Sequence, residues 1–135
     1  MLYLLRTDED LISRYDNLDI AIDILNGIYK STLECFVILH DDIRMKDGRE
    51  VRGRYTLVET WFPCKPDNKS RGIIFIDKDC NFVEMCTVLI HEYSHHLAQE
   101  GHYGKFFNLF KNWLRVEFVR RWSEYVKGRE DQELN

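Results

Sequence analysis

The segment from Asn81 to about Glu100 most constrains the fold, because its pattern is helical and its apolar residues lie nearly all around the helix. One side of the helix carries Phe82, Cys86, Leu89, Tyr93 and Leu97. The other side carries Val88 together with His91 and His95. A helix that is apolar on all sides is normally covered by other elements. We therefore expect it at the centre of the domain, ending at Gly101 as a C′ residue.

Two further helices are predicted by the same spacing rule. One runs from about 9 to 29, with Thr7 or Asp8 as its N-cap. The other runs from about 104 to 127 and has one apolar stripe, which we expect to face the core. This stripe consists of Phe107, Phe110, Leu114, Phe118, Trp122 and Tyr125. Residues 128–135 are predicted to fray, with disorder over 130–135.

Three apolar, β-rich runs predict strands at 33–40, 55–61 and 72–77. The first two are joined by a charged loop, which is typical of an antiparallel pair. The third is continuously apolar, which predicts burial on both of its faces. The sequence thus predicts an α+β fold with a small, mainly antiparallel sheet of about three strands, packed against the N-terminal, central and C-terminal helices.

Composition favours one globular domain over residues 1–135, since hydrophobic residues make up 44% and charged residues 31% of the chain. The apolar run at Met1–Leu5 is too short for a signal peptide or a membrane span. We therefore expect a cytoplasmic protein without a membrane partner. The four cysteines form no C-x-x-C pair and are expected to be free thiols in that compartment: Cys35, Cys64, Cys80 and Cys86.

The central helix contains the motif His91-Glu-Tyr-Ser-His95, an H-E-x-x-H pattern that is rare by chance. Residues four apart lie on the same helical face, so both imidazoles reach one zinc ion and Glu92 points to the adjoining position. Buried histidines and a buried glutamate without partners would each cost several kcal/mol. A bound metal would remove that cost.

A catalytic zinc usually has three protein ligands, and the candidates for the third are His96, His102 and a carboxylate. His96 is rotated by about 100° from His95 on the helix and does not reach the same ion. His102 reaches it only if the chain turns back after the helix. Gly101 and Gly104 permit such a turn, so His102 is the preferred third ligand.

The motif and the following segment, Gly101-His-Tyr-Gly-Lys-Phe106, resemble the SprT-like (Spartan-type) zinc metallopeptidases over roughly residues 33–115. The resemblance implies a zincin-like fold and a hydrolase with one Zn²⁺, held by His91, His95 and His102. It also implies that Glu92 is the catalytic base. Phe106 would be a packing residue that sets the angle of the last helix.

The expected activity is hydrolysis of peptide bonds in a protein or peptide substrate. Zinc would activate a water molecule and Glu92 would remove its proton. Tyr103, His96 and Arg71 are candidates to stabilise the oxyanion or contact substrate. The strand 72–77 is a candidate edge on which an extended peptide pairs.

Nucleic acid is a second candidate partner, because residues 105–129 hold seven basic and two acidic side chains. Trp61 and Trp113 are candidates to stack on bases. Two other functions stay open. One is a metal-dependent nuclease or other hydrolase with a three-histidine site, and the other is a non-catalytic binding module in which zinc only stabilises the fold.

Overall fold

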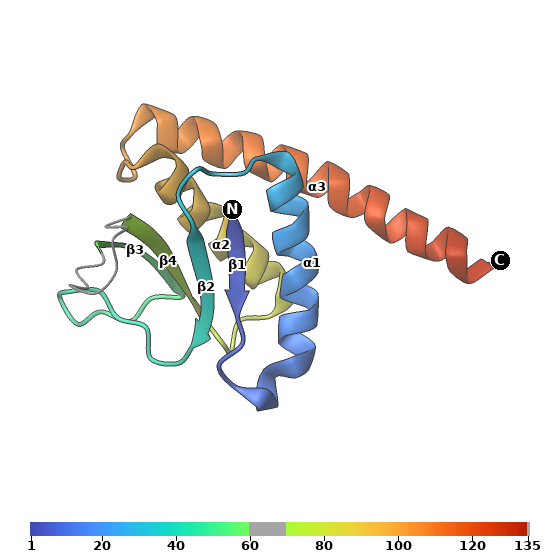
Figure 1. Ribbon diagram of the computed structural model, residues 1–135, viewed down its shortest axis with the longest axis horizontal. Coiled ribbons are helices and arrows are strands. Elements are labelled where there is room, and N and C mark those ends of the chain that lie inside the picture. The colour runs from blue at the N-terminus through green and yellow to red at the C-terminus, as the bar shows by residue number, and fades with distance from the viewer. Residues whose placement is uncertain (60–69, 135) are drawn as a thin grey trace, which may run out of the picture.

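The computed structural model describes residues 1–59 and 70–134, which form three helices and a four-stranded mixed sheet (Figure 1). The α+β class is therefore confirmed. In chain order the elements are β1 (Leu2–Leu5), α1 (Ile12–Ile28), β2 (Cys35–His40), β3 (Gly53–Glu59), β4 (Ser70–Asp77), α2 (Phe82–Ala98) and α3 (Lys105–Leu134). Trp61, Cys64 and the end of the strand predicted at 55–61 lie outside the described residues.

The strand order is β1-β2-β4-β3, which corrects the prediction of about three mainly antiparallel strands. β1 pairs with β2 and β2 with β4 in parallel, and only β3 and β4 are antiparallel. The strands predicted as an antiparallel pair, β2 and β3, are separated by β4. β2 and β4 both contain long apolar runs, residues 35–39 and 73–76, and such strands take positions with a neighbour on each side. β3, which carries more polar residues, lies at the edge.

The short strand β1 was missed because four residues give too little periodicity to detect. It is fixed to α1 by the buried side chain of Asn26. The amide oxygen of Asn26 accepts from the Leu2 backbone N–H at 2.8 Å, and its nitrogen donates to the Leu2 carbonyl at 3.0 Å. Asn26 therefore replaces part of the strand pairing that an edge strand lacks.

The helices cover one face of the sheet, and within the described part of the chain the apolar residues of β2 and β4 that face the helices are buried, whereas those on the other face are partly exposed. α1 contacts β1, whereas α2 contacts β3 and β4. Ile74 and Ile76 of β4 are fully buried beneath α2, but Ile73 and Phe75 on the opposite face stay partly exposed. The prediction that the strand 72–77 is buried on both faces is therefore wrong.

The helix α2 has the central position expected for it. It contacts the sheet and both other helices, and its buried side chains include Met85, Leu89 and Tyr93. A capping box starts it: Asn81 accepts from the Glu84 N–H at 2.9 Å, and Glu84 accepts from the Asn81 N–H.

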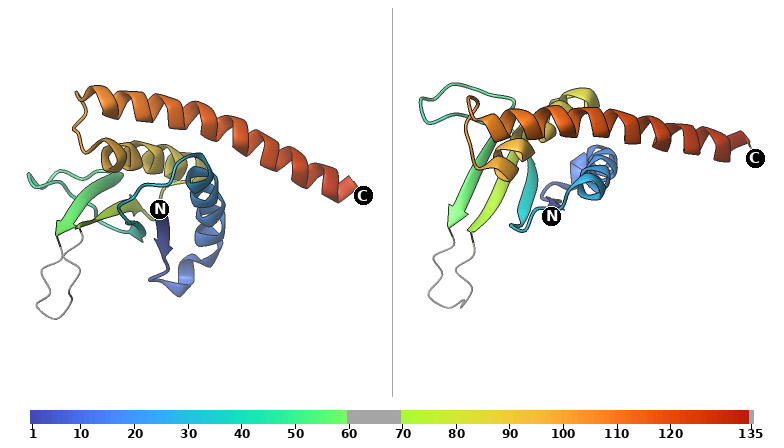
Figure 2. Two further views of the ribbon diagram at one scale, coloured as in Figure 1. Left: turned by 45° about the horizontal axis from the view of Figure 1, so that its top comes forward. Right: turned by 90° about the horizontal axis from the view of Figure 1, so that it is seen from above.

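The helix α3 crosses α1 and α2 as a further layer and then continues past α1, away from the rest of the domain (Figure 2). Phe107, Leu114 and Phe118 of the predicted stripe are buried. The helix extends to Leu134, so the frayed tail predicted for 128–135 is helical over its described part. None of the described helices is both long and apolar enough to cross a membrane.

Candidate metal centre

The structure brings together the three histidines that the sequence indicated as metal ligands. His91 and His95 lie one turn apart on α2, with ring centroids 5.0 Å apart. The His102 ring lies 5.0 Å from that of His91 and 4.8 Å from that of His95. One nitrogen from each ring can be chosen so that all three lie within 4.8 Å of one another.

This donor set fits a zinc ion. Zn–N bonds of about 2.0–2.1 Å in a tetrahedral site place two ligand nitrogens roughly 3.3 Å apart. The Nε2 atoms of His91 and His102 are 3.0 Å apart, close to that separation. Burial, followed by the nearby His95 and His102, lowers the pKa of His91 to about 4, and burial also lowers the pKa of His95. At neutral pH both rings are therefore uncharged and offer a lone pair to a cation.

The chain turns back after α2 through residues 99–104, and Gly101 is not the left-handed residue of this turn. α2 ends at Ala98, and Gln99 has the left-handed conformation with φ of 53°. The carbonyl of Glu100 lies 2.8 Å from Nδ1 of His95. This contact makes Nδ1 the protonated nitrogen and leaves Nε2 of His95 free for a metal.

The side chain of Glu100 joins the turn to α3. Its Oε2 accepts from the backbone N–H groups of Phe106 at 2.9 Å and Phe107 at 3.1 Å, which satisfies the first turn of the helix. A Cβ at Gly104 would overlap this carboxylate, so glycine is required there for steric reasons. Asn108 completes the arrangement, since its Nδ2 donates to the His102 carbonyl at 3.0 Å and to the Gly104 carbonyl at 2.9 Å.

Phe107, and not Phe106, is the aromatic residue that packs against the site. Phe106 is 57% exposed, whereas Phe107 is 1% exposed. The Phe107 ring stacks on His95 with centroids 4.2 Å apart and planes at 19°. The role that the family resemblance implied for Phe106 is therefore wrong. Helical spacing explains the difference, because only one of two adjacent residues faces α2.

Glu92 is a buried carboxyl next to the histidines, with 8% of its surface exposed. Burial raises its pKa to about 7, and a hydrogen bond from the backbone N–H of Tyr55 partly opposes this shift. Tyr55 lies on β3, so the edge strand holds the carboxyl in place. A Cβ at the nearby Gly53 would collide with Val88 and approach Glu92, which shows how closely β3 packs on α2 at this point.

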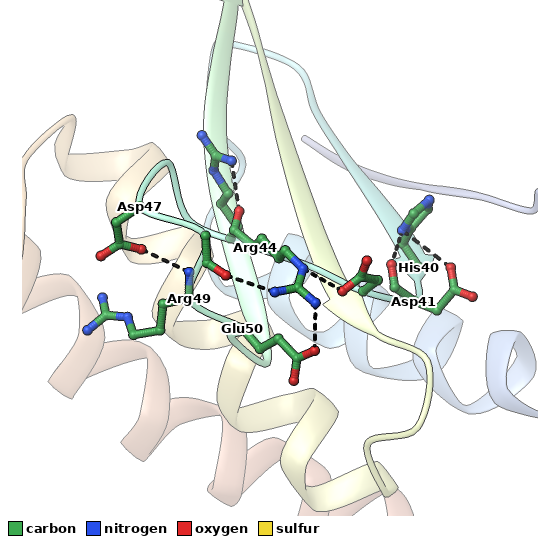
Figure 3. Close-up of polar contacts among 9 residues, drawn as sticks. His40, Asp41, Arg44, Asp47, Arg49 and Glu50 are labelled. Atoms are coloured by element: carbon green, nitrogen blue, oxygen red, sulfur yellow. Dashed lines mark hydrogen bonds and ion pairs between the residues drawn. The ribbon is translucent and has the colours of Figure 1, made fainter.

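A cleft of about 780 Å³ opens beside these groups, between α2, β3, the turn and the loop between β2 and β3, residues 41–52. The loop is held in shape by Arg44, which pairs with Asp42 at 2.8 Å and with Glu50 at 3.0 Å (Figure 3). His91, Glu92, His95 and His102 all line this cleft. The arrangement therefore combines three histidines close enough to hold a metal ion, a carboxyl with a raised pKa and space for a substrate.

Three other residues that the sequence suggested for substrate or oxyanion contact lie elsewhere. Tyr103 is fully exposed, at 103%, and does not line the cleft. Arg71 pairs with Glu34 at 3.0 Å and does not line it either. His96 is only 3% exposed, and its Nδ1 contacts the Tyr55 hydroxyl at 2.8 Å while its Nε2 contacts the Leu33 carbonyl at 3.0 Å. His96 thus holds β3 and the segment before β2 against α2.

Sequence reasoning missed Tyr55 and Glu100 as members of the site. Tyr55 lines the cleft, and its hydroxyl also accepts from the Gln99 side chain at 3.0 Å. No sequence signal marked it, because its position depends on β3 packing against α2. Glu100 had a signal: a carboxylate directly before a glycine-containing turn and a new helix is a capping pattern.

No family model matches this chain, and no curated protein or solved structure matches it either. The geometry of the site therefore carries the functional argument.

We predict that Glu100→Ala weakens zinc binding roughly ten-fold, because loss of the α3 cap loosens the turn that carries His102. Competition titration against a chromophoric chelator measures the affinity. Glu124→Ala is a matched control, since Glu124 is exposed on α3 and far along the chain from the turn. An affinity equal to that of the wild type would show that the cap does not position His102.

We predict that Glu92→Gln stabilises the metal-free protein above about pH 7. The folded pKa of Glu92 is about 7, above its usual 4.5, so the folded state loses stability as the pH rises through this window and the carboxyl ionises. Glutamine does not ionise, and the gain should reach at most about 3 kcal/mol. Urea unfolding of chelator-treated protein measures it, with the difference vanishing near pH 4. Equal stability of the two proteins at high pH would show that the pKa of Glu92 is not raised in the folded protein.

Proposed function

We propose that this chain is a zinc-dependent peptidase with a SprT-like, zincin-like site. The observation that supports this best is the meeting of three imidazoles and one buried carboxyl at the wall of a single cleft. His91, His95 and His102 would hold the ion, and Glu92 would serve as the catalytic base. This is the ligand set and the spacing of catalytic zinc sites.

An open coordination position favours catalysis over a purely structural metal. Structural zinc sites are usually closed by four protein ligands, whereas catalytic sites have three. Within residues 1–59 and 70–134, the metal-ligating cluster at this place consists of the three histidines alone. The fourth position would face the cleft that a substrate enters.

The residues of the chain account for the remaining chemistry. When bound, zinc would supply a Lewis acid that polarises the scissile carbonyl and activates water near neutral pH. Glu92 removes a proton from the attacking water and delivers it to the leaving amine. Glu92 is buried beside the cleft and held by the Tyr55 backbone N–H, so its carboxylate is positioned for both transfers.

The edge strand β3 is the place for an extended substrate, and this corrects the prediction that assigned the role to the strand 72–77. That strand, β4, is hydrogen-bonded to β2 on one side and to β3 on the other. Among residues 1–59 and 70–134, β3 has one strand neighbour, and its residues Gly53, Arg54 and Tyr55 line the cleft. A peptide that pairs with β3 would lie beside Glu92.

The structure gives nucleic acid less support as a substrate. Trp113 contacts Tyr29, with ring centroids 6.0 Å apart, and does not line the cleft. Arg120 of the basic helix α3 is paired with Glu117 at 2.7 Å and with Glu124 at 2.9 Å. A peptide substrate is therefore the better proposal.

The test is to compare the wild type with Glu92→Gln, both loaded with zinc, on unfolded casein. The wild type should cleave it, whereas the variant should keep stoichiometric zinc and lose at least about 100-fold in rate, as expected when a general base is removed. Equal cleavage by both proteins would mean that Glu92 is not the base. Cleavage of single-stranded RNA or DNA by a wild type that leaves casein intact would identify a nuclease.

A further inference from the structure

The walls around the three histidines carry more basic than acidic side chains, although the chain as a whole has a net charge of −4. Lys46, Arg49 and Arg54 line the main cleft. A second cavity of about 360 Å³ lies between α2 and α3, and it shares His91 with the first. Lys111 and Arg115 line this second cavity.

Most of these basic side chains form no ion pair with a carboxylate of the protein. Among the described residues, no carboxylate pairs with Lys46, Arg49, Lys111 or Arg115. The Asp47 carboxylate beside Arg49 accepts from the Arg49 backbone N–H at 3.0 Å, not from its guanidinium (Figure 3). Lys111 lies over the Phe107 ring, 5.3 Å from its centroid, and its charge helps to lower the pKa of His91.

The acidic side chains that line the main cleft are buried or form hydrogen bonds within the protein. Two of the three carboxyls that line the main cleft are Glu92, which is buried, and Glu100, which caps α3. No Asp or Glu lines the second cavity among the described residues. Counted together over the described part of the chain, the two cavities are lined by five basic and three acidic side chains, and the excess of positive charge lies on the α3 side of His91. An excess of one sign of charge in a cleft concentrates ligands of the opposite sign.

We infer that the cleft selects polypeptide segments with acidic side chains next to the scissile bond, and this inference rests on the proposed peptidase function. Lys46 and Arg49 on the loop 41–52 face one part of such a segment, and Lys111 and Arg115 face another. The second cavity is also lined by Phe82, Ile90 and Phe118, so it suits an acidic segment that contains apolar residues.

The test uses quenched fluorescent peptides of one length that differ only in having Glu, Gln or Lys around a central Gly-Leu. The wild type should cleave the Glu peptide roughly three- to ten-fold faster, in kcat/KM, than the Gln peptide, since exposed ion pairs contribute modestly. The Lys peptide should be slowest, and added salt should reduce the differences. The double variant Lys46→Glu with Arg49→Glu should reverse the order.

A matched control variant changes the net charge of the protein by the same amount, at positions outside the two cavities. Lys30→Glu with Lys127→Glu replaces two exposed lysines that line neither cavity, and it should keep the wild-type order. Binding of the same peptides to zinc-loaded Glu92→Gln, measured by fluorescence anisotropy, gives a readout that does not depend on turnover.

The outcomes separate the two proposals. Equal cleavage and equal binding of the three peptides would overturn the charge preference and leave the peptidase function intact. No cleavage by the wild type, with the Glu peptide still bound most tightly, would overturn the peptidase function and support the charge preference. Displacement of the Glu peptide by single-stranded DNA at lower concentration than by unlabelled peptide would assign the basic walls to nucleic acid and overturn the inference.

Discussion

The return of the chain after α2 is the constraint on which the site depends. Two imidazoles one helical turn apart bind a metal only weakly without a third, and the third comes from beyond the end of the helix. The turn 99–104 brings it back through one left-handed residue, Gln99, and through close packing of Gly104 against the Glu100 side chain. Glu100 fixes this path at both ends, because its carbonyl contacts His95 and its carboxylate caps α3. The start of α3 and the three-histidine cluster are thus one structural unit.

A second consequence is that the sheet supports the Glu92 carboxyl as well as the core. α2 lies on β3 and β4 so closely that Gly53 has no room for a side chain. This contact places the Tyr55 N–H on the Glu92 carboxyl and buries the carboxyl beside the cleft. Burial of an ionisable group costs stability, and the same burial raises the pKa of Glu92 in the metal-free protein. The proposed function therefore uses a group that the fold holds at an energetic cost.

Much of the site was predictable from the sequence, because the spacing of His91, Glu92 and His95 is local to one helix. The place of His102 was also predicted, although the residue that turns the chain was wrong. The sheet was harder, since strand order and direction depend on contacts between residues far apart in the chain. β1 has only four residues, and β4 separates β2 from β3. The same reason explains why Tyr55 and the loop 41–52 were missed: they reach the cleft only through that sheet order.

The most direct test of the central claim is a crystal structure of the zinc-loaded protein with anomalous diffraction data collected at the zinc absorption edge. The account predicts one anomalous peak within about 2.1 Å of a ring nitrogen of each of His91, His95 and His102, with the remaining position open to the cleft. A peak that lacks His102 as a ligand, or that is closed by a fourth protein ligand, would contradict it.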